Sequence, residues 1–216
     1  LTSSIARRSA YLTVHEQHWS ENVADLLYTR RMDILRHNGA EVLPVLPPSG
    51  DDFDFDAIDC NPSGPEVTVV DDFELAEKSG SPVLDIVGEK SQMTFYTSTM
   101  LQHVALHVKS VSRYMGFTFT LIDDTKETRV IVFSNKRSVV TVDKNMCYLP
   151  VEIGEGWQYL TLDFERICAN AFGTRYVSCT ECTVNGSCRL SKLFFQKNEY
   201  ADVELPEFLR VCVVED

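Results

Sequence analysis

The segment from Gly156 to Gln196 changes its hydrophobic period twice, and this constrains the fold more than any other part of the chain. From Trp157 to Leu162 the residues alternate, with apolar side chains on both faces, as in a half-buried strand. From Phe164 to Phe172 the apolar residues recur at helical spacing, and from about residue 176 the alternation returns. Two strands joined by one short helix are typical of an antiparallel sandwich or jelly roll, in which the chain passes between two sheets.

The ends of the short helix, expected over about residues 164–172, also follow from the sequence. Asp163 can cap its start, because the carboxylate accepts hydrogen bonds from the free amides of the first turn and suits the helix dipole. Gly173 can take the left-handed conformation that ends a helix. The block therefore predicts strand, capped helix and strand, and it contains no recognisable set of catalytic residues.

Further short strands surround this block. Several segments alternate or are rich in β-branched and aromatic residues, and turns such as Asp123–Lys126 and Ser134–Arg137 separate them. The expected strands are 82–87, 92–97, 103–110, 117–122, 129–133, 139–142 and 147–153. Such a series predicts a mainly β fold, with an antiparallel sandwich over residues 80–216.

Motifs in a fixed order along this region resemble the cilia- and flagella-associated protein 20 family: SPVLDIVGEKSQMTFYTS, GW, a strand ending in LDF, AFGTRY, NGSCRLSKLFF and ELPEFL. The resemblance covers residues 80–213. It implies a compact sandwich similar to carbohydrate-binding modules, with a non-enzymatic structural role in ciliary doublet microtubules. In that family the domain lies among tubulin and other axonemal proteins at the inner junction. The resemblance thus implies an axonemal location, with a cytosolic pool before assembly.

Polar and charged positions within these motifs are the candidate partner-binding residues. They are expected on the surface of the sandwich, where edges and loops would contact several neighbours at once. The candidates are Arg166, Asn170, Thr174, Arg175, Asn185, Arg189 and Lys192.

Residues 1–40 differ from that family, whose members begin with a strand segment, so a divergent member and a paralogue both remain open. The stretch from Glu16 to Asn38 predicts one amphipathic helix, because its apolar residues fall near one stripe and its arginines cluster late, where the dipole favours cations. Gly39 is expected to end this helix.

Residues 41–79 form an acidic, proline-containing segment. From Glu41 to Glu77 it holds 11 acidic residues and no Lys or Arg, in a chain whose net charge is −12. Such a composition predicts a solvated linker without regular structure. The alternative is a docking segment, in which Phe53 and Phe55 anchor an electrostatically steered contact with a partner.

Metal and cofactor sites are not expected. The chain has seven cysteines, an odd number without disulfide-like spacing, which indicates a reducing compartment. Cys179 and Cys182 form a C-x-x-C pair, but on a strand residues three apart point to opposite faces. His103 and His107 would share the outer face of a strand, ~13 Å apart from the rise per residue, which is too far to share a metal. Buried, inert thiols and polar surface histidines are the simpler interpretation.

An alternative function remains for the same sandwich, namely a soluble glycan-binding or nuclear adaptor module. Exposed aromatic residues such as Trp157 or Tyr159 could bind a sugar. Bare nucleic acid is disfavoured because phosphate binding needs a concentrated basic face. A membrane span is disfavoured too, since no apolar run approaches the ~20 residues needed. No nucleophile, metalloprotease or phosphate-loop motif supports an enzyme.

Overall fold

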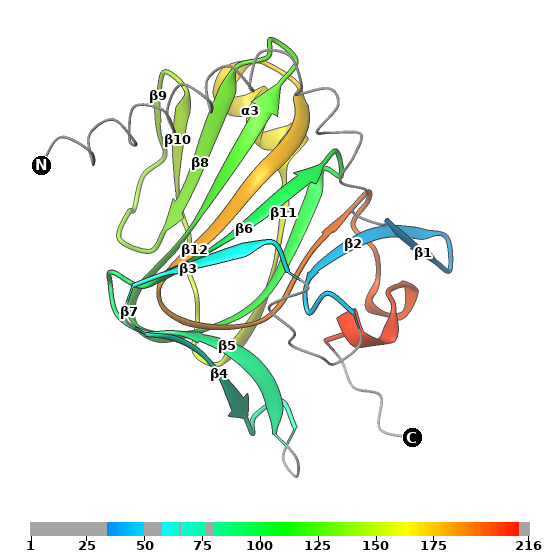
Figure 1. Ribbon diagram of the computed structural model, residues 1–216. Coiled ribbons are helices and arrows are strands. Elements are labelled where there is room, and N and C mark those ends of the chain that lie inside the picture. The colour runs from blue at the N-terminus through cyan, green and yellow to red at the C-terminus, as the bar shows by residue number, and fades with distance from the viewer. Residues whose placement is uncertain (1–33, 50–57, 65, 77–79, 212–216) are drawn as a thin grey trace, which may run out of the picture. The chain divides into compact units, whose positions relative to one another are not determined.

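The computed structural model describes residues 34–49, 58–64, 66–76 and 80–211 (Figure 1). The first strands are β1 (Leu35–His37), β2 (Ala40–Leu46), β3 (Cys60–Ser63), β4 (Val67–Asp72), β5 (Ser81–Ile86) and β6 (Gln92–Thr99). They are followed by β7 (His103–Asp123), β8 (Thr128–Ser134), β9 (Thr141–Asp143), β10 (Met146–Pro150) and β11 (Trp157–Asp163). The last elements are helix α3 (Phe164–Phe172), strand β12 (Tyr176–Gln196) and the 3-10 turns η2 (Asp202–Glu204) and η3 (Glu207–Leu209).

Two 21-residue strands, β7 and β12, pair along their length and run through the centre of the fold. On its other side β12 pairs first with β6, then with β5 and β2. On its other side β7 pairs with β11 through its first half and with β8 through its second half. The two long strands are therefore shared by both layers of a β-sandwich, and Figure 1 shows them crossing the whole fold.

A glycine permits the irregularity in the middle of β12. The register between β12 and β7 shifts just after Gly186, which has a φ of 84°. A Cβ at this position would lie 2.4 Å from the carbonyl oxygen of Tyr114. Only glycine fits there, because the obstacle is backbone and the conformation is left-handed.

The pairing is mainly antiparallel, as predicted. One margin departs from this, because β10 runs parallel to β8, and the short β9 pairs antiparallel with β10. Within the described strands β9 is the last member of this row.

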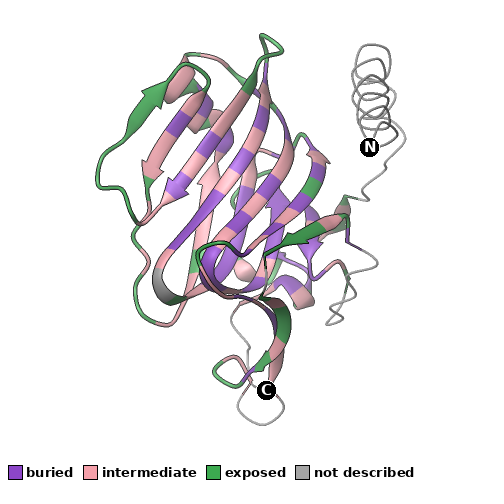
Figure 2. Cartoon of the chain, turned by 60° about the vertical axis from the view of Figure 1, so that its left-hand side comes forward, coloured by how far each residue is buried: buried purple, intermediate pink, exposed green. Residues whose placement is uncertain are grey.

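The core lies between the layers, and Figure 2 shows buried residues alternating with less buried ones along the strands. Phe164, the first residue of α3, is fully buried. Its ring centroid lies 5.1 Å from that of Phe119 on β7, 5.5 Å from Tyr176 and 6.4 Å from Phe195 on β12. The Phe164 ring thus joins the helix to both long strands, β7 and β12.

The predicted strand, capped helix and strand are confirmed. Asp163 accepts a hydrogen bond from the Arg166 amide at 3.0 Å, and Gly173 has a φ of 70° at the end of α3. The strands expected at 103–110 and 117–122 are two parts of the single strand β7. Their fusion could not be read from the pattern, since the bend between them interrupts the alternation.

The prediction that the N-terminal helix extends to Asn38 is wrong. Leu35–His37 is strand β1, and Asn38 and Gly39 form the turn into β2, with φ values of 46° and 85°. Asn38 and Gly39 thus form the two-residue loop of a β-hairpin, for which Asn-Gly is a strong sequence signal. This signal outweighs the weak apolar stripe that predicted a helix. The remainder of the predicted helix, residues 16–33, lies outside the described residues.

The acidic segment is not a structureless linker throughout, because it contains β2, β3 and β4. β2 pairs with β12, β3 with β6, and β4 with β5. The apolar residues of β2 are buried, and its Pro44 lies opposite Phe194 at a register irregularity. The predicted boundary at residue 80 therefore falls inside the sheet. Composition misled the prediction because it averages the short strands with the acidic stretches between them in the sequence.

Candidate partner-binding site

Helix α3 brings two of the predicted residues together. Arg166 and Asn170 are exposed and lie four residues apart, so they share one face of the helix. The N-cap at Asp163 and the left-handed Gly173 fix the ends of this helix, and buried Phe164 and Cys168 hold its opposite side. The face is thus a rigid, solvent-facing surface.

Arg175 continues this surface toward the β7–β8 turn, next to Thr174, which is half-buried and whose hydroxyl oxygen is buried. Arg175 is exposed, and its Nε donates to Asp124 Oδ2 at 3.1 Å, while its backbone N donates to Asp124 Oδ1. The hydrogen bond from the Arg175 amide lowers the pKa of Asp124, and the guanidinium lowers it further. We call Arg166, Asn170, Thr174 and Arg175 the α3 surface. Figure 1 shows α3 at one end of the sandwich.

The turn beside the α3 surface is held by Asp123, whose exposed fraction is 1%. Its Oδ1 accepts from the amides of Thr125 and Glu127 and from the Thr125 hydroxyl, and its Oδ2 accepts from Arg129 Nε at 2.7 Å. Burial alone would raise the pKa of this carboxyl, but these hydrogen bonds outweigh it and leave the pKa well below its ordinary value. The carboxylate therefore organises the turn, as the sequence suggested, and is occupied by partners.

Asn185 lies apart from the α3 surface, in the middle of β12. It is half-buried, and its Oδ1 is 3.0 Å from the position that a Cβ of Gly116 would take. The glycine opposite it on β7 thus makes room for the amide. The structure does not join Asn185 to the other predicted residues.

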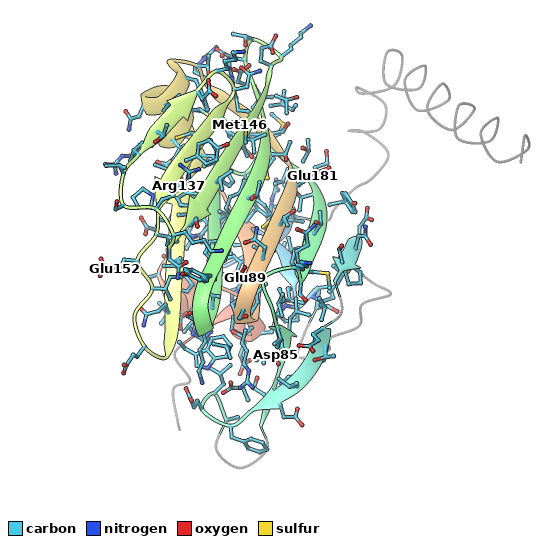
Figure 3. The ribbon with its side chains drawn as sticks, turned by 90° about the vertical axis from the view of Figure 1, so that its left-hand side faces the viewer. Asp85, Glu89, Arg137, Met146, Glu152 and Glu181 are labelled. Carbon is cyan, nitrogen blue, oxygen red and sulfur yellow. The ribbon has the colours of Figure 1, made fainter. Side chains whose placement is uncertain are left out.

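Arg189 belongs to a partly buried ion-pair cluster and not to an open surface. Its NH1 lies 2.7 Å from Asp72 Oδ2, and its Nε lies 3.1 Å from Asp85 Oδ1. Figure 3 shows Asp85 far from Glu181, which lies on the first half of β12. The guanidinium of Arg189 connects β12 with β4 and β5. This structural role is an alternative to the predicted partner-binding role.

Asp72 is the centre of this cluster, and sequence reasoning missed it. The side chain is 2% exposed and accepts from Arg189, from the Glu74 amide at 2.9 Å and from Trp157 Nε1 at 3.4 Å. Lys109 Nζ lies 3.8 Å away. Burial alone would raise the pKa of Asp72, but the hydrogen bond from Arg189 and the other donors leave it lowered. Nothing in the acidic segment marked this aspartate, because its charged partners lie more than 30 residues away.

Lys192 lies at a polar cavity of about 350 Å³ between β5, β7, β12 and η3. Its Nζ donates to the carbonyl oxygen of Phe208 at 2.7 Å, so the side chain fastens η3 to β12. His107 and Arg210 also line this cavity.

His107 is buried, so its prediction as an outer-face residue is wrong. Its Nδ1 is 2.6 Å from Ser191 Oγ, and its ring centroid is 4.9 Å from that of Trp157. The residues after β12 cover this face, where Leu205 and Leu209 pack against Ala105. Burial lowers the pKa of His107 to about 4, and the nearby Lys192 charge acts in the same direction.

Cys179 and Cys182 share a face, contrary to the prediction that they diverge. A bulge between Cys179 and Glu181 shifts the alternation, so that Cys179 lies opposite Leu121 and Cys182 opposite Phe119. Both thiols are fully buried, and burial raises the pKa of Cys179 to about 12. Within the described residues no group of three or more His, Cys, Asp or Glu side chains is placed to hold a metal ion.

The remaining candidates, Phe53 and Phe55, lie outside the described residues, so their docking role stays a prediction. Of the helices that the structure describes, none has the length and apolarity to cross a membrane.

The fold and these surfaces define a mainly β, two-layered sandwich domain with one capped helix at its end. The CFA20 domain family matches residues 63–213, and the chain belongs to this family. The matched region includes β4 to β12 and the α3 surface.

Two relatives illustrate the similarity. The chain is 26% identical over 135 residues to "Cilia- and flagella-associated protein 20" of Chlamydomonas reinhardtii, which covers 58% of this chain and 71% of that protein. It is 27% identical over 139 residues to the protein of the same name in Caenorhabditis elegans, which covers 60% and 68%.

Solved structures are more distant. An exo-β-agarase matches with a TM-score of 0.41 and 8% identity over 74% of this chain and 25% of that chain. A family 11 carbohydrate-binding module of Clostridium thermocellum matches with a TM-score of 0.33 and 8% identity, over 70% and 93%. These scores are too low to support an argument about ligands.

Proposed function

We propose that this chain is a non-enzymatic structural component of the cilium or flagellum, within the doublet microtubules and at or near their inner junction. The observation that carries the proposal is the CFA20 domain match over residues 63–213, together with relatives named as cilia- and flagella-associated. The partners are then tubulin and neighbouring axonemal proteins in a large hetero-assembly, without nucleic acid, membrane or cofactor. A cytosolic pool precedes assembly.

The geometry of the charged groups supports a structural role. Asp72 and Asp123, two buried carboxylates, already accept several hydrogen bonds that join separate strands or fix a turn. His107 is stacked on Trp157 and bonded to Ser191. Each of these groups thus has a structural task.

The α3 surface is the part of the domain best suited to hold a neighbour. Its residues are fixed by the two caps of α3 and by the Asp124–Arg175 contact, so a partner would bind without ordering a loop.

The test is to express the tagged full chain in a ciliated cell and to follow it through axoneme isolation and salt extraction. The protein is expected to remain with salt-washed axonemes, and Arg166→Glu is expected to move it to the soluble fraction. Lys90→Glu, a charge reversal at another exposed position, is the matched control and should be retained. A wild-type protein found only in the soluble fraction would contradict the proposal and favour a soluble adaptor.

A further inference from the structure

The segment from Lys136 to Asn145 is an exposed margin of the sandwich, and all of its residues are solvent-accessible. It contains β9, which among the described strands pairs with β10 and ends the row. Figure 2 shows exposed strand and loop residues at this margin of the sheet. The outer edge of β9 is thus available for hydrogen bonding to another strand.

Three valines make this margin unusual. Val139 is 70% exposed, Val140 58% and Val142 45%. Proteins normally protect a sheet edge with proline or charges, as the edge strands β3 and β4 do here with Pro62 and Asp71. The segment from Lys136 to Asn145 has no proline, its charged residues other than Asp143 lie outside the strand, and its valines lie beside or within the edge strand.

The same segment is locally basic, although the chain is acidic overall. It carries Lys136, Arg137 and Lys144 against the single acid Asp143, in a chain of net charge −12. Arg137 lies over the Tyr148 ring at 4.0 Å, and Lys136 lies 4.1 Å from the Tyr114 centroid and 3.6 Å from Glu89. Figure 3 shows Arg137 on the part of the sheet that also carries Met146 of β10. Arg137 thus holds positive charge beside β10, next to the open edge, whereas Lys136 reaches back toward β7 and is paired with Glu89.

We propose that β9 accepts an acidic, extended segment of a partner protein as an added strand. Backbone hydrogen bonds to the edge give the pairing, alternate apolar side chains cover the valines, and acidic side chains meet Arg137 and Lys144. This inference goes beyond the proposed function, because it names the chemistry of a partner segment and holds in solution without any axoneme.

The test measures binding of the purified full chain to a fluorescent ten-residue peptide in which valine alternates with glutamate. We expect saturable binding that weakens as salt is added, since exposed charges are screened. A peptide with lysine in place of glutamate is expected to bind at least about tenfold more weakly. The glutamate peptide with alternate amides N-methylated should lose binding, because it cannot pair along one edge.

Charge-reversal variants locate the site. Arg137→Glu combined with Lys144→Glu is expected to weaken binding of the peptide about tenfold or more. The matched control is Lys90→Glu combined with Lys126→Glu, which should bind like wild type. Lys126 and Lys144 are both exposed turn lysines with positive φ, 67° and 49°, so the two pairs carry similar backbone costs. Thermal unfolding of both variants establishes that they are folded.

Several results would overturn the proposal. They are absence of peptide binding up to about 1 mM, equal binding of the N-methylated peptide, and equal losses in the two variant pairs. Concentration-dependent dimerisation that Val140→Lys abolishes would assign the edge to a second copy of this chain. A photo-crosslinker placed at Val140 that captures residues 1–33 of the same molecule would assign it to the chain itself.

Discussion

The structure describes two of the chain's three Asp-Asp pairs, Asp71–Asp72 and Asp123–Asp124, and in each of these two pairs one carboxylate is buried while its neighbour is exposed. Asp123 is bound by groups at most six residues away, in its own turn. Asp72 is bound by Trp157 and Arg189, which lie 85 and 117 residues away. The same dipeptide thus serves a local turn at one site and a junction of four strands at the other.

The difference shows that burial of a charged group depends on where its donors come from. At the first site the backbone of the turn supplies donors wherever that turn forms. At the second site only the Glu74 amide is local, and the side-chain donors come together only after β4, β7, β11 and β12 have assembled. We therefore expect the Asp123 turn to tolerate partial unfolding better than the Asp72 cluster.

The largest expected effect is that of Asp123→Ala, which should lower the free energy of unfolding by about 3–5 kcal/mol, because it leaves Arg129 and two amides without their acceptor. Urea denaturation followed by fluorescence measures this change. Asp124→Ala is the matched control and should have a much smaller effect. Equal effects of the two variants would mean that burial does not distinguish the two aspartates.

Acid should affect the two sites in different pH ranges. The pKa of His107, next to Trp157 in the Asp72 region, is about 4 in the folded protein against 6.5 ordinarily, so the unfolded chain takes up a proton first. Stability is then lost as the pH falls from about 6.5 toward 4, by about 3 kcal/mol. The pKa of Asp123 is also lowered, from 3.8, so its contribution is lost only at more acidic pH.

Urea denaturation at a series of pH values checks this order. In the variant His107→Gln, which keeps a polar partner for Ser191, the loss between pH 6.5 and 4 should be largely absent. An unchanged slope in that variant would show that another group binds the proton.

Asp72→Ala should lower the free energy of unfolding by about 2 kcal/mol, less than Asp123→Ala. The reason is that the Arg189 side chain is 29% exposed and can recover water, whereas that of Arg129 is 12% exposed. Asp71→Ala is the exposed control. A double-mutant cycle with Arg189→Met measures the coupling, and a coupling near zero would contradict the assigned contact.

The smallest expected effect is at the start of α3. Asp163→Ala should cost about 1 kcal/mol, since the Arg166 amide loses its acceptor, while Asp163→Asn should cost less because it keeps a capping oxygen. Thermal unfolding of the two variants compares them. If alanine and asparagine are equivalent, the cap does not stabilise α3 measurably.

Local signals made much of the fold predictable. The N-cap at Asp163, the glycine at 173 and the alternation of β6, β8 and β12 are all determined by residues close together in the chain. Of the candidate site, the α3 surface was predictable in the same way, because helical spacing places Arg166 and Asn170 on one face. Arg189 and Lys192 were correctly placed in a strand, but their ion pair and carbonyl contact could not be read from the sequence.

The errors arose because local patterns and average composition do not show how distant segments pair and pack. β2 and β4 were hidden in an acidic, proline-containing segment, because composition averages over strands and the loops between them. The divergence expected for Cys179 and Cys182 ignored a bulge, which depends on how β12 fits against β7. His107 looked exposed because the residues that cover it, after β12, are about 100 positions later in the chain.

The sequence by itself determined the strand–helix–strand block, its caps, the sandwich class and the family. The block and its caps rest on interactions within a few residues, where spacing decides which groups meet, whereas the class and the family follow from the order of strands and motifs along the chain. Only the tertiary structure decided which aspartate of each pair is buried, which face the thiols share, and that β9 ends a row of strands. Those outcomes depend on register and on contacts between distant segments, which no local pattern encodes.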